Sequence, residues 1–162
     1  MKNKGFSSLD NPSHEGKTNT WLTPLELIHK LGNFDLDPCG YPNHRTAKEL
    51  YCLPDNGLEK PWFNRVWLNP PYGKNIKKWI DRLANHGNGI ALVFSRTDTE
   101  WFFNCNADAI FFIKGRIKFL QPDLSLSTNA GHGSMFLIYG LENIKAVNNS
   151  KIKGKLMDEI PC

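Results

Sequence analysis

The sequence predicts an α/β domain with a largely parallel sheet. Apolar runs typical of strands alternate along the chain with segments typical of helices. The run at 89–95, GIALVFS, is apolar throughout, as expected for a strand buried on both faces. Polar residues follow the runs at 34–38, 66–70 and 89–95, and ligands of such sheets bind at the carboxyl ends of strands. We therefore expect one site along this edge, including Asp35 and Asp37.

The first helix is predicted at 23–32, from the segment TPLELIHKLG. Thr23 is expected as its N-cap and Pro24 as its first helical residue, with Glu26 completing a capping box. Gly32 then ends the helix.

The next elements alternate in type. FDLDP is a short strand that stops at Pro38, and VWLNP is a second strand. The segment 75–87 is an amphipathic helix that ends at Gly87, and one face carries four apolar residues at helical spacing: Ile76, Trp79, Ile80 and Leu83. After the buried strand at 89–95, TDTEWFFNC predicts a helix capped by Thr97 and Glu100, and AIFFIKG and SMFLIYG predict two further strands.

Length and charge limit the classes of protein. The 162 residues correspond to about one domain, and the net charge of +4 permits a polyanionic partner without requiring one. Residues 1–20 are polar and aperiodic, so we expect a flexible N-terminal arm. Residues 21–140 form the predicted main domain, and 141–162 are expected to be a peripheral C-terminal tail or a short edge element.

Cysteine usage and the N-terminus favour a cytoplasmic protein with free thiols. None of the four cysteines is spaced as C-x-x-C, and the N-terminus has no apolar signal region. No apolar run is long enough to span a membrane. A zinc site made of Cys39, His44 and Cys52 would match no common finger, so we predict no metal.

The stretch NPPY at 69–72 ends a strand in an unusual way. Neither proline has an N–H, so the segment cannot continue the strand and is held stiff. The side-chain oxygen of Asn69 and the carbonyl of Pro70 are two acceptors that suit an –NH₂ group, and Tyr72 offers a face for a planar ring. From these residues alone, a strand-ending turn whose tyrosine packs into the core is an equal alternative.

NPPY also resembles the D/N/S-P-P-Y/F motif of amino-directed methyltransferases that use S-adenosylmethionine. Further segments, in the same order, resemble the small phage-type, Dam-like DNA adenine-N6 methyltransferases: WLTPLELIHKL, FDLDPCG, DNGL…W…VWLNPPYG, RTDTEWF, GRIKF and GSMFLIYG. The resemblance covers about residues 21–140. It implies a trimmed, Rossmann-like class I methyltransferase fold, with a mostly parallel sheet and helices on both faces.

The resemblance implies a cofactor site for S-adenosylmethionine. Thr23 would lie near the methionine carboxylate of the cofactor and Asp37 at its amino group. Pro38 and Gly40 would shape the loop, and Asp55 would lie near the adenosine. Asn69 would also border the cofactor. The chain departs from the G-x-G loop that many methyltransferases have after the first strand, because only Gly40 follows here.

The same resemblance implies that Asn69, Pro70, Pro71 and Tyr72 hold the target adenine. Direct displacement rewards positioning, and hydrogen bonds from N6 to the two acceptors would favour a more tetrahedral nitrogen. Since the target atom lies inside a duplex, the base must be flipped out, with Tyr72 as its stacking partner.

Basic residues are the candidate contacts to DNA. Lys74, Arg96 and Arg116 are predicted to bind DNA. Three more basic residues near NPPY either meet phosphates or form a solvated helix face: Lys77, Lys78 and Arg82. Alternatively, Arg96 and Arg116 pair with Asp98 and Asp123. The loop at 125–134 is expected to be mobile, and its His132 either approaches the substrate or is simply exposed.

The leading hypothesis is a site-specific methyltransferase acting on N6 of adenine in double-stranded DNA. One alternative is transfer to another planar amine, namely adenine in RNA, N4 of cytosine or a protein glutamine. A second alternative, from a different class, is a catalytically silent nucleic-acid-binding module.

Overall fold

The computed structural model describes residues 20–127 and 131–158. The expected arm at 1–20 therefore lies outside the described residues except for Thr20, as do Cys162 and the middle of the 125–134 loop. Four helices are present in the described ranges: α1 (Leu25–His29), α2 (Ile76–His86), α3 (Glu100–Phe103) and α4 (Leu141–Asn149).

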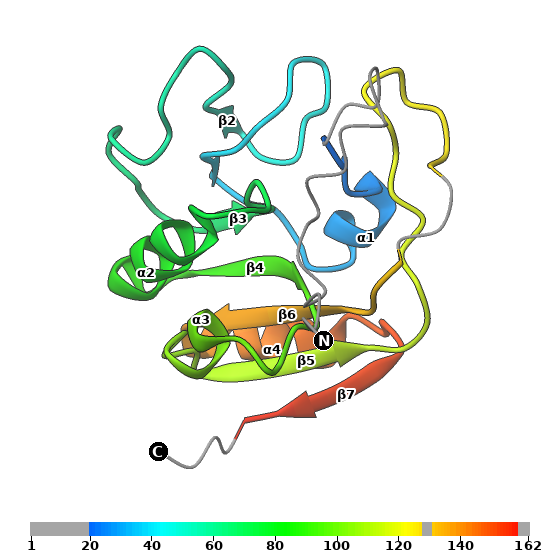
Figure 1. Ribbon diagram of the computed structural model, residues 1–162. Coiled ribbons are helices and arrows are strands. Elements are labelled where there is room, and N and C mark those ends of the chain that lie inside the picture. Colours follow the sequence, from blue (N-terminus) through cyan, green and yellow to red (C-terminus); the bar gives the residue numbers. More distant parts are fainter. Residues whose placement is uncertain (1–19, 128–130, 159–162) are drawn as a thin grey trace, which may run out of the picture.

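One seven-stranded sheet forms the centre of the protein, in the order β2-β1-β3-β4-β6-β5-β7 (Figure 1). Its strands are β1 (Leu36–Asp37), β2 (Glu49–Leu50), β3 (Val66–Leu68), β4 (Gly89–Phe94), β5 (Ala109–Ile113), β6 (Ser134–Tyr139) and β7 (Gly154–Met157). The two-residue strands β1 and β2, with no helix between β1 and β3, make this side of the sheet small.

The prediction of a mostly parallel sheet is wrong for the second half of the chain. The pairs β1–β2, β1–β3 and β3–β4 are parallel, whereas β4–β6, β5–β6 and β5–β7 are antiparallel. β6 lies between β4 and β5 and runs against both. The sequence did not reveal these strand directions because an uninterrupted apolar run indicates only burial on both faces. A central antiparallel strand covered by helices has the same pattern.

Helices cover both faces of the sheet. In β4, Ile90 and Leu92 pack with α1 and α4 on one face, while Ala91 and Val93 pack with α2 and α3 on the other. Figure 1 shows α4 behind β5 and β6. The apolar face predicted for α2 is the one that meets the sheet, since all four of its predicted residues are buried. This double burial gives the strand ends a rigid base.

Two predicted capping boxes do not form. Helix α1 begins at Leu25 after Pro24, without a side-chain cap, because Thr23 is buried and turned to other partners. Helix α3 begins at Glu100 after Thr99, so Thr97 does not cap it. Helix α2, by contrast, ends as predicted at Gly87, which adopts a left-handed conformation with φ of 75°.

The segment that the sequence analysis assigned to a peripheral tail, 141–162, contains α4 and β7. Asn143 and Val147 of α4 are buried, and Val147 belongs to the core on the α1 side. β7 pairs with β5 along the sheet edge. The described part of this segment is therefore attached to the sheet.

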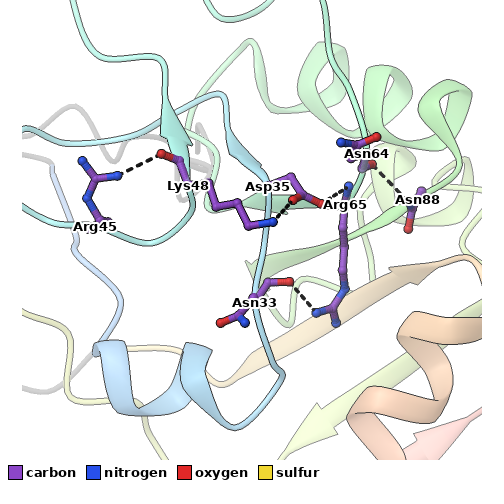
Figure 2. A network of polar contacts seen from close by, with 7 residues as sticks. All are labelled: Asn33, Asp35, Arg45, Lys48, Asn64, Arg65 and Asn88. Atoms are coloured by element: carbon purple, nitrogen blue, oxygen red, sulfur yellow. Dashed lines mark hydrogen bonds and ion pairs between the residues drawn. The ribbon is translucent and has the colours of Figure 1, made fainter.

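The prediction that Asp35 shares the site with Asp37 is wrong. Asp35 precedes β1 and therefore lies at the amino ends of the strands, whereas Asp37 lies at the carboxyl end of β1. It accepts a hydrogen bond from Lys48 Nζ at 2.7 Å and one from the backbone N–H of Arg65 at 3.2 Å (Figure 2). The Lys48 ammonium lowers the pKa of Asp35 below its ordinary value. Asp35 thus belongs to a polar network that joins the amino ends of the strands.

Candidate functional site

A cavity of about 570 Å³ opens at the carboxyl ends of β1 and β3. All residues predicted for catalysis and cofactor binding line it: Thr23, Asp37, Pro38, Gly40, Asp55, Asn69, Pro70, Pro71 and Tyr72. The volume is within the range of ordinary small-molecule sites. The ends of β1 and β3, the segment before α1 and the loop after β2, which carries Asp55, therefore bring the predicted residues into one place, in line with the carboxyl-end rule.

The amide of Asn69 is oriented by the protein itself. Its Nδ2 donates to the carbonyl of Trp21 at 2.7 Å and to the Thr23 hydroxyl oxygen at 3.3 Å. Since a carbonyl can only accept, the –NH₂ group must face Trp21. The Oδ1 atom of Asn69 is buried and has no hydrogen-bond partner among the described residues. A buried acceptor without a donor is costly, so this oxygen is suited to a ligand N–H.

A second acceptor lies beside it. Pro70 is buried and lines the cavity, and within the described ranges no backbone N–H donates to its carbonyl. Asn69 and Pro70 together therefore present the two acceptors that an –NH₂ group needs.

Tyr72 lines the cavity but has one face covered. Its ring stacks on Phe94, with the ring centroids 4.2 Å apart and the planes at 14°. Phe94 also contacts the rings of Phe119 and His132. Burial raises the pKa of the Tyr72 hydroxyl well above its ordinary value, so the hydroxyl stays protonated. Only the other face of Tyr72 is left for a planar ligand, and Phe94 holds the tyrosine ring in place.

Asp37 is a buried carboxyl group at the end of β1, with 3% of its surface exposed. It accepts hydrogen bonds from the backbone N–H of Cys39 at 2.9 Å and from the hydroxyl of Thr46. Burial raises its pKa to about 6, and these two hydrogen bonds oppose the rise. No ion pair to Asp37 occurs in the part of the chain that the structure describes.

The cavity as a whole favours a cation with planar rings. Asp37 and Asp55 line it, whereas no lysine or arginine does so among residues 20–127 and 131–158. Asp55 forms an ion pair with Lys60 at 2.9 Å. Aromatic side chains supply much of the remaining wall: Trp21, Tyr41, Tyr51 and Trp79.

Three residues that support the predicted site residues were given no such role by the sequence analysis, which named His44 only for a zinc site. Phe94, at the end of β4, supports Tyr72. His44 and Thr46 contact Thr23 and Asp37 from the loop after β1. Phe94 ends the buried strand β4, which pairs with the strand that leads to NPPY, and this position is a usable sequence indication. The loop residues carry none, because their contacts depend on how the loop folds back.

The basic residues near NPPY differ in their surroundings. Lys74 and Lys78 line a second cavity of about 510 Å³, which shares Tyr72 and Trp79 with the first. Both lysines are exposed, and neither takes part in an ion pair within the described ranges. Lys77 pairs with Asp81 at 2.7 Å.

Arg82 is also occupied. It donates to the carbonyl of Lys60 at 2.7 Å, and its guanidinium lies 5.1 Å from the ring centre of Trp62. Of the four basic residues on this side, Lys74 and Lys78 are therefore the ones free to meet an anion.

Arg96 and Arg116 do not line either cavity. Arg116 is exposed and Arg96 half-buried, and no ion pair to Asp98 or Asp123 occurs among the described residues. Their contacts to DNA stay predictions.

Neither a cluster of metal-binding side chains nor a membrane-spanning helix occurs in the part of the chain that the structure describes. Within residues 20–127 and 131–158, no three His, Cys, Asp or Glu side chains gather in a way that could hold a metal ion. Cys39, Cys52 and Cys105 are free thiols. None of the described helices has the length and apolar character needed to cross a membrane.

Comparison with known proteins bears on the whole of this site. The family model described as DNA N-6-adenine-methyltransferase (Dam) matches residues 12–157. The match includes the segments at both strand ends as well as α4 and β7. No curated protein and no solved structure matches the chain.

Proposed function

Because the chain belongs to the DNA N-6-adenine-methyltransferase (Dam) family, we propose that it transfers a methyl group from S-adenosylmethionine to N6 of adenine in double-stranded DNA. The proposal includes a class I methyltransferase fold with residues 21–140 as the catalytic unit. The α/β sheet with helices on both faces supports the fold assignment.

One observation carries the proposal above all others. The Oδ1 atom of Asn69 is buried without a donor among residues 20–127 and 131–158, while its Nδ2 donates to the carbonyl of Trp21. An acceptor fixed in this way discriminates in favour of a ligand that brings N–H groups and against one that brings only acceptors. The exocyclic amine of adenine has two N–H groups, which the carbonyl of Pro70 and the amide of Asn69 can share.

The residues of the cavity also fit S-adenosylmethionine. Asp37 would bind its ammonium group in a charge-assisted pair, which supplies the cation that the buried carboxylate lacks. The absence of lysine and arginine from the described lining suits a ligand with an ammonium and a sulfonium. Thr23 would lie near the carboxylate, and Asp55 near the adenosine.

The chain's own contribution to the reaction is positioning and polarisation. When bound, S-adenosylmethionine supplies a methyl group on a sulfonium, so transfer forms one carbon–nitrogen bond, breaks one carbon–sulfur bond and leaves a neutral thioether. Asn69 and Pro70 accept the N6 hydrogens and favour a more tetrahedral nitrogen, as in the transition state. The N6 proton leaves to water after transfer, so no strong general base is required.

The target adenine must leave the duplex to reach Asn69. The face of Tyr72 that Phe94 does not cover is the proposed stacking surface for the flipped base. Because Phe94 already orders the Tyr72 ring, little side-chain entropy is lost when the base binds.

A comparison of substrates tests the proposal. The protein is incubated with methyl-labelled S-adenosylmethionine and, separately, unmethylated duplex DNA, RNA or protein. After digestion, label in N6-methyldeoxyadenosine from duplex DNA supports the proposal. Label on cytosine, or only in RNA or protein, supports transfer to another planar amine. Cofactor binding without any labelled product supports a silent nucleic-acid-binding module.

Cofactor binding is expected to depend on the ionisation of Asp37. With a pKa of about 6, the carboxyl group is about one tenth ionised at pH 5 and about nine tenths at pH 7. The amino group of the cofactor stays protonated over this range. The Kd for S-adenosylmethionine should therefore fall about ten-fold from pH 5 to pH 7, as measured by calorimetry.

Asp37→Asn should bind weakly with little pH dependence, and Asp98→Asn, outside the cavity, should behave as wild type. A pH dependence of the Kd that persists in Asp37→Asn would contradict the assignment.

The stability of the protein without cofactor should change with pH in the opposite direction to its affinity for the cofactor. Because the unfolded chain ionises Asp37 near pH 4, the free energy of unfolding should decrease as the pH rises from about 4 to about 6.

Lys74 and Lys78 are expected to bind phosphates of the DNA. The double variant Lys74→Ala, Lys78→Ala should bind duplex DNA more weakly and lower the slope of log affinity against log salt by about 2, or about 0.9 per lysine. Fluorescence anisotropy of a labelled duplex at several salt concentrations measures this. Lys77→Ala, which loses only the pair with Asp81, is the matched control, and an equal slope change there would exclude a specific role for the other two lysines.

A further inference from the structure

We propose that His44 is a positioning residue that, through Thr23, holds the acceptor oxygen of Asn69 in place for the target amine. The inference rests on the proposed function for the role of Asn69. It assigns a further task to the loop after β1, which the sequence indicates only as part of the cofactor site.

His44 makes a long-range contact from that loop to the segment before α1. It is buried, with 3% of its surface exposed, and its Nε2 lies 2.8 Å from the carbonyl oxygen of Thr23. Burial lowers the pKa of His44, so the ring is neutral at pH 7 and carries a single N–H. Since the carbonyl can only accept, that N–H is at Nε2.

Thr23 passes the restraint to Asn69. Thr23 is 1% exposed, and its hydroxyl oxygen accepts a hydrogen bond from Nδ2 of Asn69 at 3.3 Å. The neighbouring carbonyl of Trp21 accepts the other hydrogen bond of that amide at 2.7 Å. The backbone of 21–23 therefore determines where the Oδ1 atom of Asn69 points. Leu22 pairs with Leu120 through two backbone hydrogen bonds, and among the described residues His44 ties the Thr23 carbonyl to the loop after β1.

The same loop also holds Asp37. The hydroxyl of Thr46 donates to the Asp37 carboxylate, and the backbone N–H of Thr46 donates to the carbonyl of His44 at 3.0 Å. Two residues of one loop thus support two ends of the cavity, with Thr46 at the cofactor's ammonium position and His44 on the side of the target amine. Replacing Thr46 should therefore affect cofactor binding, and replacing His44 should affect methyl transfer.

The test compares His44→Phe, which keeps a ring but loses the N–H, with His44→Gln, whose amide N–H is as far from Cα in bonds as the histidine Nε2. Single-turnover methyl transfer to duplex DNA and cofactor Kd are measured for both. His44→Phe should lower the transfer rate about ten-fold or more and change the cofactor Kd much less, and His44→Gln should recover most of the rate. Thr46→Val should instead raise the cofactor Kd about ten-fold.

His86→Phe is the matched control. His86 also contacts a backbone carbonyl through Nε2, that of Asn64 at 2.8 Å, but at the opposite edge of the sheet. It should leave the transfer rate unchanged. An unchanged rate in His44→Phe, or a His44→Gln variant no better than His44→Phe, would overturn the inference.

A second measurement does not depend on activity. The side-chain amide of Asn69 gives a pair of NMR signals, which can be identified by their loss in Asn69→Ser. These signals should shift in His44→Phe and return toward their wild-type positions in His44→Gln. Wild-type protein that methylates no substrate would refute the proposed function, while the amide signals would still decide whether His44 positions Asn69. Signals unmoved in His44→Phe would exclude that role.

Discussion

Replacing Asn69 by alanine is expected to lower the rate of methyl transfer by about 10²- to 10³-fold. The variant loses the buried Oδ1 acceptor of a residue that lines the cavity, and this oxygen has no donor among the described residues. The two acceptors act on the nitrogen as it becomes tetrahedral, so their loss is felt in the rate rather than in ground-state binding. Single-turnover transfer to duplex DNA at saturating cofactor measures the effect.

Cofactor binding should change only a few-fold in the same variant, through the lost contacts to Trp21 and Thr23. Asn104→Ala is the matched control, because this asparagine is exposed and lies outside both cavities, and its rate should equal that of wild type. If Asn69→Ala loses cofactor binding as severely as the rate, Asn69 has a structural role in the cavity wall instead.

Replacing Arg65 by methionine is expected to lower the free energy of unfolding by about 3 kcal/mol. The guanidinium donates to Asn143 Oδ1 at 2.6 Å and to the carbonyls of Leu31 and Asn33, each at 2.9 Å. It also lies 4.2 Å from the ring centre of Phe34. Figure 2 shows part of this network at the amino ends of the strands, away from the cavity.

The reason for the size of this effect is that the partners of Arg65 are left without donors. Asn143 has no exposed surface, so its Oδ1 could not turn to water. Urea unfolding measures the loss. Arg65→Lys should recover only part of it, because an ammonium cannot reproduce the planar donor set.

Arg45→Ala is the control for Arg65. Arg45 is exposed and, within the described ranges, its side chain makes one hydrogen bond, to the carbonyl of Lys48. Its removal should therefore cost less than about 0.5 kcal/mol. Equal losses in the two variants would contradict the account of the network. Folded Arg65→Met should retain the wild-type transfer rate, since no atom of this residue borders the cavity.

Continuous apolar runs and the helical spacing of apolar residues in the sequence predicted most of the regular elements. The apolar face of α2, its end at Gly87 and the buried run of β4 are local features that survive in the structure. Strand direction is not local. β6 enters the sheet between β4 and β5 from a distant part of the chain, and its residues are as apolar as those of a parallel strand.

The site was predictable to the extent that its residues form contiguous motifs. The residues of NPPY and Asp37 lie at strand ends, where the general rule for α/β sheets places ligands. Thr23 was expected as a helix cap and in fact contacts Asn69, because its environment is set by tertiary packing rather than by the following helix. The roles of His44 and Thr46 likewise depend on contacts that no local pattern encodes.

The central claim is that the acceptors of Asn69 and Pro70 hold the exocyclic amine of adenine. The most direct measurement is mass spectrometry of the nucleosides obtained after duplex DNA is incubated with S-adenosylmethionine and the protein. We expect N6-methyldeoxyadenosine from the wild-type protein and almost none from Asn69→Ala. Methyl groups found only on cytosine N4, or equal amounts of N6-methyldeoxyadenosine from both proteins, would contradict the account.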